Sequence, residues 1–149
     1  MTEGTLRAKL HMLGLSFLVL AVAGCGMLFY PKAGDFRKQA QGTTGVETLL
    51  NLTTMLEASA EATRGETYMA GLDDLHNQFH ALHDSMCGVT EEQAKTPAYA
   101  KAVTLEREMW VVFKRLWRTR ENQAVREANL DLFSKRNQEL REALQAVKG

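Results

Sequence analysis

Residues 10–30 form a run of twenty-one residues without one charged side chain, in a chain that is otherwise polar. At about 1.5 Å per residue, a helix of this length is about 30 Å long, which matches the hydrocarbon thickness of a bilayer. We therefore expect residues 1–31 to be a membrane anchor and the run to be a spanning helix. The membrane is the first partner that the sequence predicts.

A second interpretation of the run is a bacterial lipoprotein signal. Arg7 and Lys9 supply a basic start, an apolar stretch follows, and residues 22–25 (VAGC) match the motif that ends in a lipidated cysteine, here Cys25. The apolar run continues through residues 26–30, where mature lipoproteins usually turn polar. An uncleaved anchor is therefore favoured, with a lipid on Cys25 as the alternative.

The signal-like order of basic, apolar and small residues predicts that the body lies on the exoplasmic (periplasmic) side of the membrane. Basic residues on both sides of the run do not strengthen this orientation, since two precede it and three follow it by residue 38. After the anchor we expect a linker over residues 32–43 and one domain over residues 44–149.

The domain is expected to be all-α. The chain has only two prolines, good helix formers dominate, and no strand-like alternation occurs. Apolar residues recur every three or four positions over 102–116 and again over 130–147, separated by a polar stretch at 119–126. The first half has one such stripe over 46–63 and a second, in another phase, over 72–86.

Residues 88–97 are expected to connect the two halves, with Thr96 as N-cap and Pro97 as the first residue of the second long helix. Antiparallel partners should then have numbers that sum to roughly 185. On this register Gly65, at the phase break, lies level with Arg120 in the polar stretch. Two architectures fit: a long antiparallel helical hairpin with a polar waist, or a compact four-helix bundle in which both arms bend at this level.

The net charge of zero conceals a strong segregation. Residues 43–93 contain 9 acidic and 1 basic side chains, whereas residues 94–149 contain 12 basic and 7 acidic ones. The simplest interpretation is that the two helical halves pair across the flanks of a shared apolar seam. The basic side chains of the second half are then solvated or internally paired, and no nucleic-acid partner is predicted.

A polar stripe in the first half is the candidate for metal chemistry. Its members keep the three-four spacing, one residue out of step with the apolar stripe: Asp73, His76, His80, His83 and Cys87. Histidines four residues apart on a helix can bind one nickel, cobalt, copper or zinc ion, and a thiolate would complement them. The inferred register adds Met109, opposite His76. The alternative is that these are half-exposed polar residues on a helix flank.

Together with the N-terminal anchor, the histidine pair makes the chain resemble membrane-anchored periplasmic helical metal sensors and heavy-metal-resistance proteins. The shared features are a similar length, Asp74-Leu75-His76 with His80 four residues on, and residues 89–93 (VTEEQ), which are similar to the helix-opening Leu-Thr-x-x-Gln of stress-induced periplasmic helical proteins. In the sensors the pair lies soon after the anchor, whereas here about forty-five residues intervene. The resemblance implies a metal-binding sensor or chaperone.

The second half has more apolar width than a two-stranded seam buries, because Trp110, Phe113 and Trp117 lie beside that seam. Two tryptophans in water would be an unusual patch, so a partner subunit, a second copy or a folded-back arm should cover them. Catalytic motifs are absent, and an enzyme is not expected. The sequence predicts a membrane-tethered interaction protein, either an accessory subunit of a membrane complex or a homo-oligomer, with the metal sensor or chaperone as the alternative.

Overall fold

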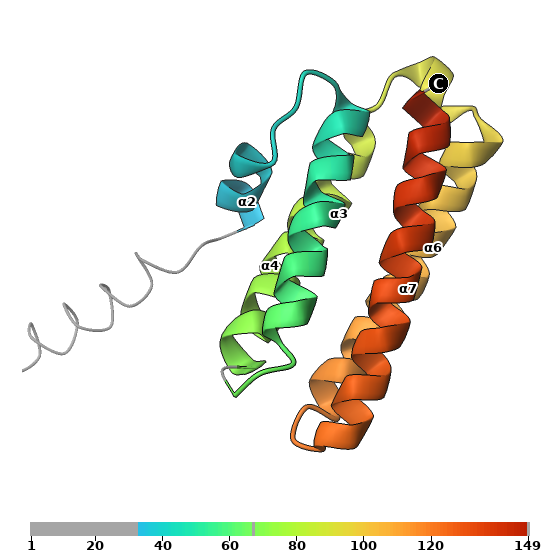
Figure 1. The fold of residues 1–149 in the computed structure, drawn as a ribbon. Helices are drawn as coiled ribbons and strands as arrows, with labels where there is room; N and C mark the ends of the chain where they lie inside the picture. The colour runs from blue at the N-terminus through green and yellow to red at the C-terminus, as the bar shows by residue number, and fades with distance from the viewer. Residues whose placement is uncertain (1–32, 67, 149) are drawn as a thin grey trace, which may run out of the picture. The chain divides into compact units, whose positions relative to one another are not determined.

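The computed structural model describes residues 33–66 and 68–148, and the regular structure within them is helical (Figure 1). The short elements are α2 (Ala33–Gln39), the 3-10 turn η1 (Met86–Gly88) and α5 (Glu91–Ala94). The long elements are α3 (Gly45–Ala62), α4 (Tyr68–Ser85), α6 (Pro97–Arg118) and α7 (Gln123–Lys148). The all-α prediction is confirmed for these residues.

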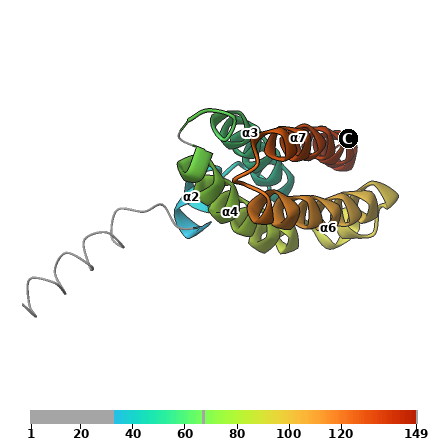
Figure 2. The same ribbon diagram turned by 90° about the horizontal axis from the view of Figure 1, so that it is seen from below.

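The four long helices pack side by side, each antiparallel to its neighbours (Figures 1 and 2). Helix α3 contacts α4 and α7, and α6 contacts the same two helices. Both arms of the predicted hairpin are therefore folded back where their apolar stripes are interrupted. Of the two architectures that fit the sequence, the described residues adopt the compact one.

Side-chain caps fix where the helices begin. The first N–H groups of a helix have no partner within it, and a hydroxyl oxygen at the N-cap can accept one of them. The Thr44 hydroxyl accepts from the N–H of Glu47 at the start of α3, and the Thr96 hydroxyl accepts from the N–H of Tyr99 at the start of α6. The predicted N-cap at Thr96, followed by Pro97, is therefore confirmed.

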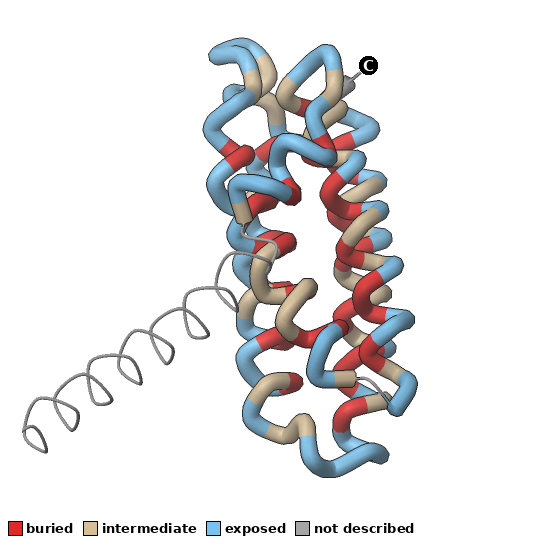
Figure 3. The backbone as a smooth tube through the Cα atoms, turned by 90° about the vertical axis from the view of Figure 1, so that its left-hand side faces the viewer, coloured by how far each residue is buried: buried red, intermediate tan, exposed pale blue. Residues whose placement is uncertain are grey.

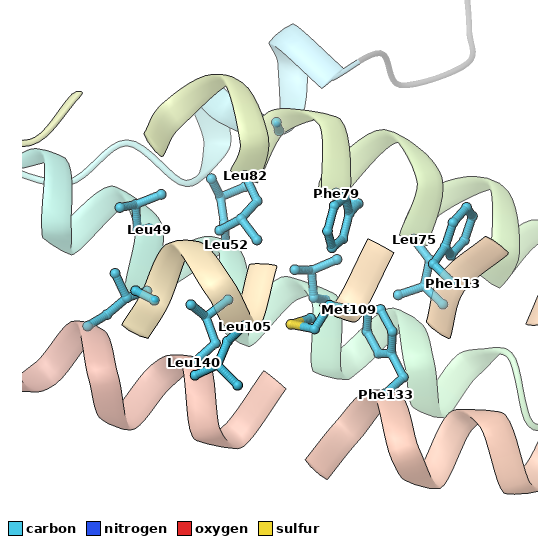
Figure 4. Close-up of a cluster of buried hydrophobic side chains, with 14 of the residues drawn as sticks. Leu49, Leu52, Leu75, Phe79, Leu82, Leu105, Met109, Phe113, Phe133 and Leu140 are labelled. Atoms are coloured by element: carbon cyan, nitrogen blue, oxygen red, sulfur yellow. The ribbon is translucent and has the colours of Figure 1, made fainter. Parts of the chain in front are cut away.

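The predicted apolar stripes form the core between the four helices. Buried positions repeat along the inward faces of the helices (Figure 3), and their side chains meet in the interior (Figure 4). The larger members of this core include Leu49, Leu52, Leu75, Phe79, Leu82, Leu105, Met109, Phe113, Phe133 and Leu140. Burial of each such side chain contributes about 1.5–3 kcal/mol, so this packing is the main source of stability.

Polar residues within the stripes make hydrogen bonds across the α3/α7 interface. The amide nitrogen of the buried Asn137 donates to the carbonyl oxygen of Thr53 over 2.8 Å and to the carboxylate of Glu57 over 3.0 Å. Arg141 donates to the hydroxyls of Thr53 and Thr54. A buried polar group without a partner is costly, so these bonds favour one register of α7 on α3.

The polar stretch of the second half lies at one end of the bundle. There the guanidinium of Arg64, after α3, pairs with the Glu127 carboxylate of α7 over 2.8 Å. The buried Arg126 donates to the carbonyl oxygen of Arg120 over 2.7 Å, and its guanidinium carbon lies 4.2 Å from the centroid of the Tyr68 ring. These contacts join the α3/α4 connection to the α6/α7 connection.

The sequence predicts a linker over residues 32–43, but that range contains helix α2, which packs against α4. Phe36 and Ala40, four positions apart, lie on one face and are buried. The side-chain amide of Asn51 donates to the carbonyl oxygen of Ala40 over 2.9 Å. The segment is therefore part of the bundle, because two apolar residues at helical spacing find a surface to cover.

Helices α4 and α6 are offset by one helical turn from the register expected from the sequence. His76 stacks on Phe113 instead of facing Met109, and Phe79 stacks on Trp110. The turn η1 and helix α5 both lie in the connection between the two arms. The lengths of η1 and α5 cannot be inferred from the spacing of the flanking apolar stripes. These two elements shift the alignment of α4 with α6.

In the described part of the chain, no helix combines the length and the apolarity needed to cross a membrane. The run at residues 10–30, where the anchor is predicted, lies outside the described residues. Cys25, the predicted lipidation site, lies there too.

The close approach of α4 to the end of α3 yields a prediction. A Cβ at Gly71 would lie 2.5 Å from the hydroxyl oxygen and 2.8 Å from the backbone nitrogen of Thr63, whereas a Cβ at Gly34 meets nothing within 4 Å. Gly71→Ala should therefore lower the free energy of unfolding by about 1–3 kcal/mol. Gly34→Ala, the matched control in α2, should be neutral or slightly stabilising. Urea unfolding of both variants decides this, and equal stabilities would contradict the packing described here.

Candidate functional site

Aromatic rings fill the seam between α4 and α6. The imidazole of His76 is stacked on the ring of Phe113, with centroids 5.6 Å apart and an interplanar angle of 9°. It also lies 6.2 Å from Trp110 and 6.1 Å from Trp117. Phe79, one turn further along α4, stacks on Trp110 with centroids 5.3 Å apart. Rings of this size act as spacers between the two helices.

The predicted partner-binding residues are thus covered in part by α4 of the same chain. Phe113 is 3% exposed, and Trp110 and Trp117 are half-buried. A folded-back arm is one of the three covers that the sequence leaves open, and α4 acts as such an arm. Binding of a partner by these three residues stays a prediction.

Two hollows remain along this seam, one on each side of Trp110. The larger one, of about 410 Å³, is lined by Phe79, His80, His83, Glu106, Arg107, Trp110 and Val111. The smaller one, of about 310 Å³, is lined by His76, Trp110, Phe113, Lys114, Trp117 and Arg118. Val111 is 53% exposed at the edge of the larger hollow. The seam is therefore an apolar groove, with the indole ring of Trp110 between its two hollows.

Basic side chains of α6 border this groove. Arg107, Lys114 and Arg118 are exposed and follow one another at helical spacing, on the same face as Val111. The ammonium of Lys114 lies 5.9 Å from the Trp110 ring. None of the three cations forms an ion pair within the described residues. The sequence predicts solvation or internal pairing for this face, and for these three side chains the structure shows solvation.

Among the predicted metal ligands, the structure brings His76 and His80 together. Their Nε2 atoms are 3.1 Å apart and their ring centroids 4.7 Å apart, so the two nitrogens lie on facing edges of the rings. Burial lowers the pKa of His76 below its ordinary value, the charge of His80 lowers it further, and Asp73 opposes both effects. His76 therefore favours its neutral form, which is the form that can ligate a metal.

The other predicted ligands lie elsewhere. His83 faces the carboxylate of Glu106, 5% exposed, with 3.1 Å between Nδ1 and Oε1. Cys87 is exposed beside a separate polar groove, and its thiol donates to the carbonyl oxygen of Asp84. Met109 is fully buried in the core. Within residues 33–66 and 68–148, no cluster of three or more His, Cys, Asp or Glu side chains could enclose a metal ion.

Two features of the site are missed by reading the sequence alone. These are the burial of the Glu106 carboxylate and the position of the three cations along the groove, for which the sequence leaves both solvation and internal pairing open. The second feature has a sequence signal, since Arg107, Val111, Lys114 and Arg118 recur at helical spacing beside the tryptophans. Glu106 has none, because its burial depends on the α4/α6 register.

Comparison with known proteins found no matching family model, no matching curated protein and no matching solved structure. The resemblance to helical metal sensors therefore stays a prediction from the residues.

The lowered pKa of His76 can be measured directly. In an NMR titration of the histidine ring protons, the pKa of His76 should lie below the ordinary value of 6.5. His80→Gln removes a repelling charge and should raise it. A lowered pKa in the folded wild-type protein means that the unfolded chain binds this proton more readily than the folded chain does. Protonation of His76 should therefore lower the free energy of unfolding as the pH falls below about 6.5. A pKa of His76 at or above 6.5 would show that the ring is not desolvated by the aromatic stack.

Proposed function

We propose that this protein is a membrane-tethered docking protein that binds a segment of another protein subunit in the groove between α4 and α6. The observation that carries the proposal is the groove itself, an apolar surface with two hollows and an exposed valine. Interface centres are enriched in aromatic residues and arginine and depleted of other charges. The seam has the aromatic residues and arginines of such a centre, with Glu106 and Lys114 as its other charged side chains.

Internal packing accounts for part of the aromatic face, but not for all of it. Helix α4 covers Phe113, yet Trp110 and Trp117 stay half-buried and line hollows. Half-exposed tryptophans in concave sites are typical binding anchors, because their large rings gain contact area at little entropic cost. A bound segment would complete the cover that α4 begins.

The apolar run at residues 10–30 supports a membrane tether. A tether confines the domain to the membrane surface and raises its effective concentration toward a partner in the same membrane. A modest groove of this kind can then bind a membrane-associated subunit without a large interface. This supports an accessory subunit of a membrane complex.

Site-specific photo-crosslinking tests docking. A photoreactive amino acid at Val111, in the full chain expressed in its native membrane, should give one adduct of defined mass with another subunit. The same label at Met69 is the matched control, because Met69 is also an exposed apolar residue on a helix but does not line the seam. Equal labelling at both positions, or no adduct at Val111, would refute docking at this groove.

A second candidate function is transition-metal binding by His76 and His80, which the convergence of their Nε2 atoms favours. Two nitrogens at about 2.0–2.1 Å from one ion lie about 2.9 Å apart at a right angle and about 3.3 Å apart at a tetrahedral angle. The observed 3.1 Å lies between these values. Copper, nickel or zinc would fit, with solvent supplying the remaining ligands.

Tryptophan fluorescence tests the metal candidate, because Trp110 lies 5.6 Å from the His80 ring. Copper(II) added to the full chain in detergent should quench the emission, and either His76→Gln or His80→Gln should weaken binding by about 10²-fold, since chelation needs both rings. His83→Gln is the matched control and should bind as the wild type does. Unchanged quenching in the His76→Gln/His80→Gln double variant would rule out this pair as the site.

A further inference from the structure

We infer that an acidic amphipathic helix of the partner subunit occupies the α4/α6 groove. This inference rests on the docking function proposed above. The inference follows from the charges that border the groove and from the shape of the two hollows. It names the chemistry of the partner, which docking alone leaves open.

Three cations border the groove against one carboxylate in its lining, Glu106 beside His83, and this excess of positive charge selects the sign of the partner. Arg107, Lys114 and Arg118 border the groove and make no ion pair within the part of the chain that the structure describes. Other arginines of the domain do pair, as Arg64 does with Glu127 and Arg136 does with Glu108. Cations left unpaired beside an apolar surface attract carboxylates and repel basic segments.

The shape of the groove selects a helix. From Arg107 to Arg118 the bordering helix is about 16 Å long, which corresponds to about three turns of a helix lying alongside it. Hollows on either side of Trp110 would receive apolar side chains one or two turns apart, as a helix presents at i, i+4 and i+7. An extended strand gains little here, because the described residues form no sheet edge to which its backbone could bond.

A flat anionic membrane surface would also be attracted by these cations, but it fits the site less well. The ring of Trp110 is stacked between His76, Phe79 and Phe113 instead of projecting outward. Membrane-interface tryptophans need to insert their rings among the headgroups. Filling two hollows between helices requires projecting side chains, which a partner helix has.

Both tryptophans of the chain line the seam, so their emission reports occupancy. The full chain in zwitterionic lipid nanodiscs is titrated with a helical probe peptide that has leucines at i, i+3, i+4 and i+7 flanked by glutamates. A second peptide has lysines in place of the glutamates, and phosphatidylglycerol vesicles are a third probe. The acidic peptide should shift the emission and release heat in calorimetry, and the lysine peptide should not bind.

Charge-reversal variants make the test specific. Lys114→Glu with Arg118→Glu should weaken the acidic peptide about tenfold and allow the lysine peptide to bind. Arg115→Glu is the matched control, because Arg115 is an exposed arginine of α6 that lines neither hollow, and it should change the affinity less than about twofold.

Three results would overturn the inference: equal binding of both peptides, equal effects of the double variant and the control, or displacement of the acidic peptide by phosphatidylglycerol vesicles. A specific adduct at Val111 without binding of the acidic peptide would leave docking intact and refute only the acidic helix. Absence of the adduct would refute docking itself.

Discussion

The domain depends on two chain reversals that lie at the same end of the bundle. Arg126 joins them, because its guanidinium lies over the ring of Tyr68 and donates to the carbonyl of Arg120. With both arms reversed here, each long helix buries two flanks instead of one. The wide apolar face of α6 can then be covered by α7 on one side and by α4 on the other, which a simple hairpin could not achieve.

The contacts between neighbouring helices of the bundle involve side chains of very different size. Gly71 approaches the backbone of Thr63 so closely that a Cβ there would force the neighbouring atoms to shift, and α7 is hydrogen-bonded to α3 through Asn137 and Thr53. Between α4 and α6, stacked rings separate the helices instead. The two hollows of the groove are lined by these rings, so the groove depends on which side chains face this seam.

Much of the fold could be predicted from the sequence, because periodicity and caps are local signals. The stripes over 46–63 and 72–86 and the cap at Thr96 are where the pattern indicates. The choice between hairpin and bundle could not be made, since both bury the same stripes. The sequence places Met109 opposite His76 through a register that the connecting segment shifts by one helical turn. The proximity of His76 and His80 can be predicted without knowing how the helices align, because both residues lie on one helix.

The two proposed functions share one seam, which makes them interdependent. His80 lines the larger hollow and His76 the smaller one, so a partner helix in the groove would lie against both rings. A metal ion bound by only two histidines takes its remaining ligands from solvent, which a partner would displace. If the partner supplies a carboxylate in place of that water, metal and partner each strengthen the binding of the other; if it does not, each weakens the other by the same factor. An acidic helix is the kind of partner that can supply such a ligand, so the charge of the occupant also determines the sign of this coupling.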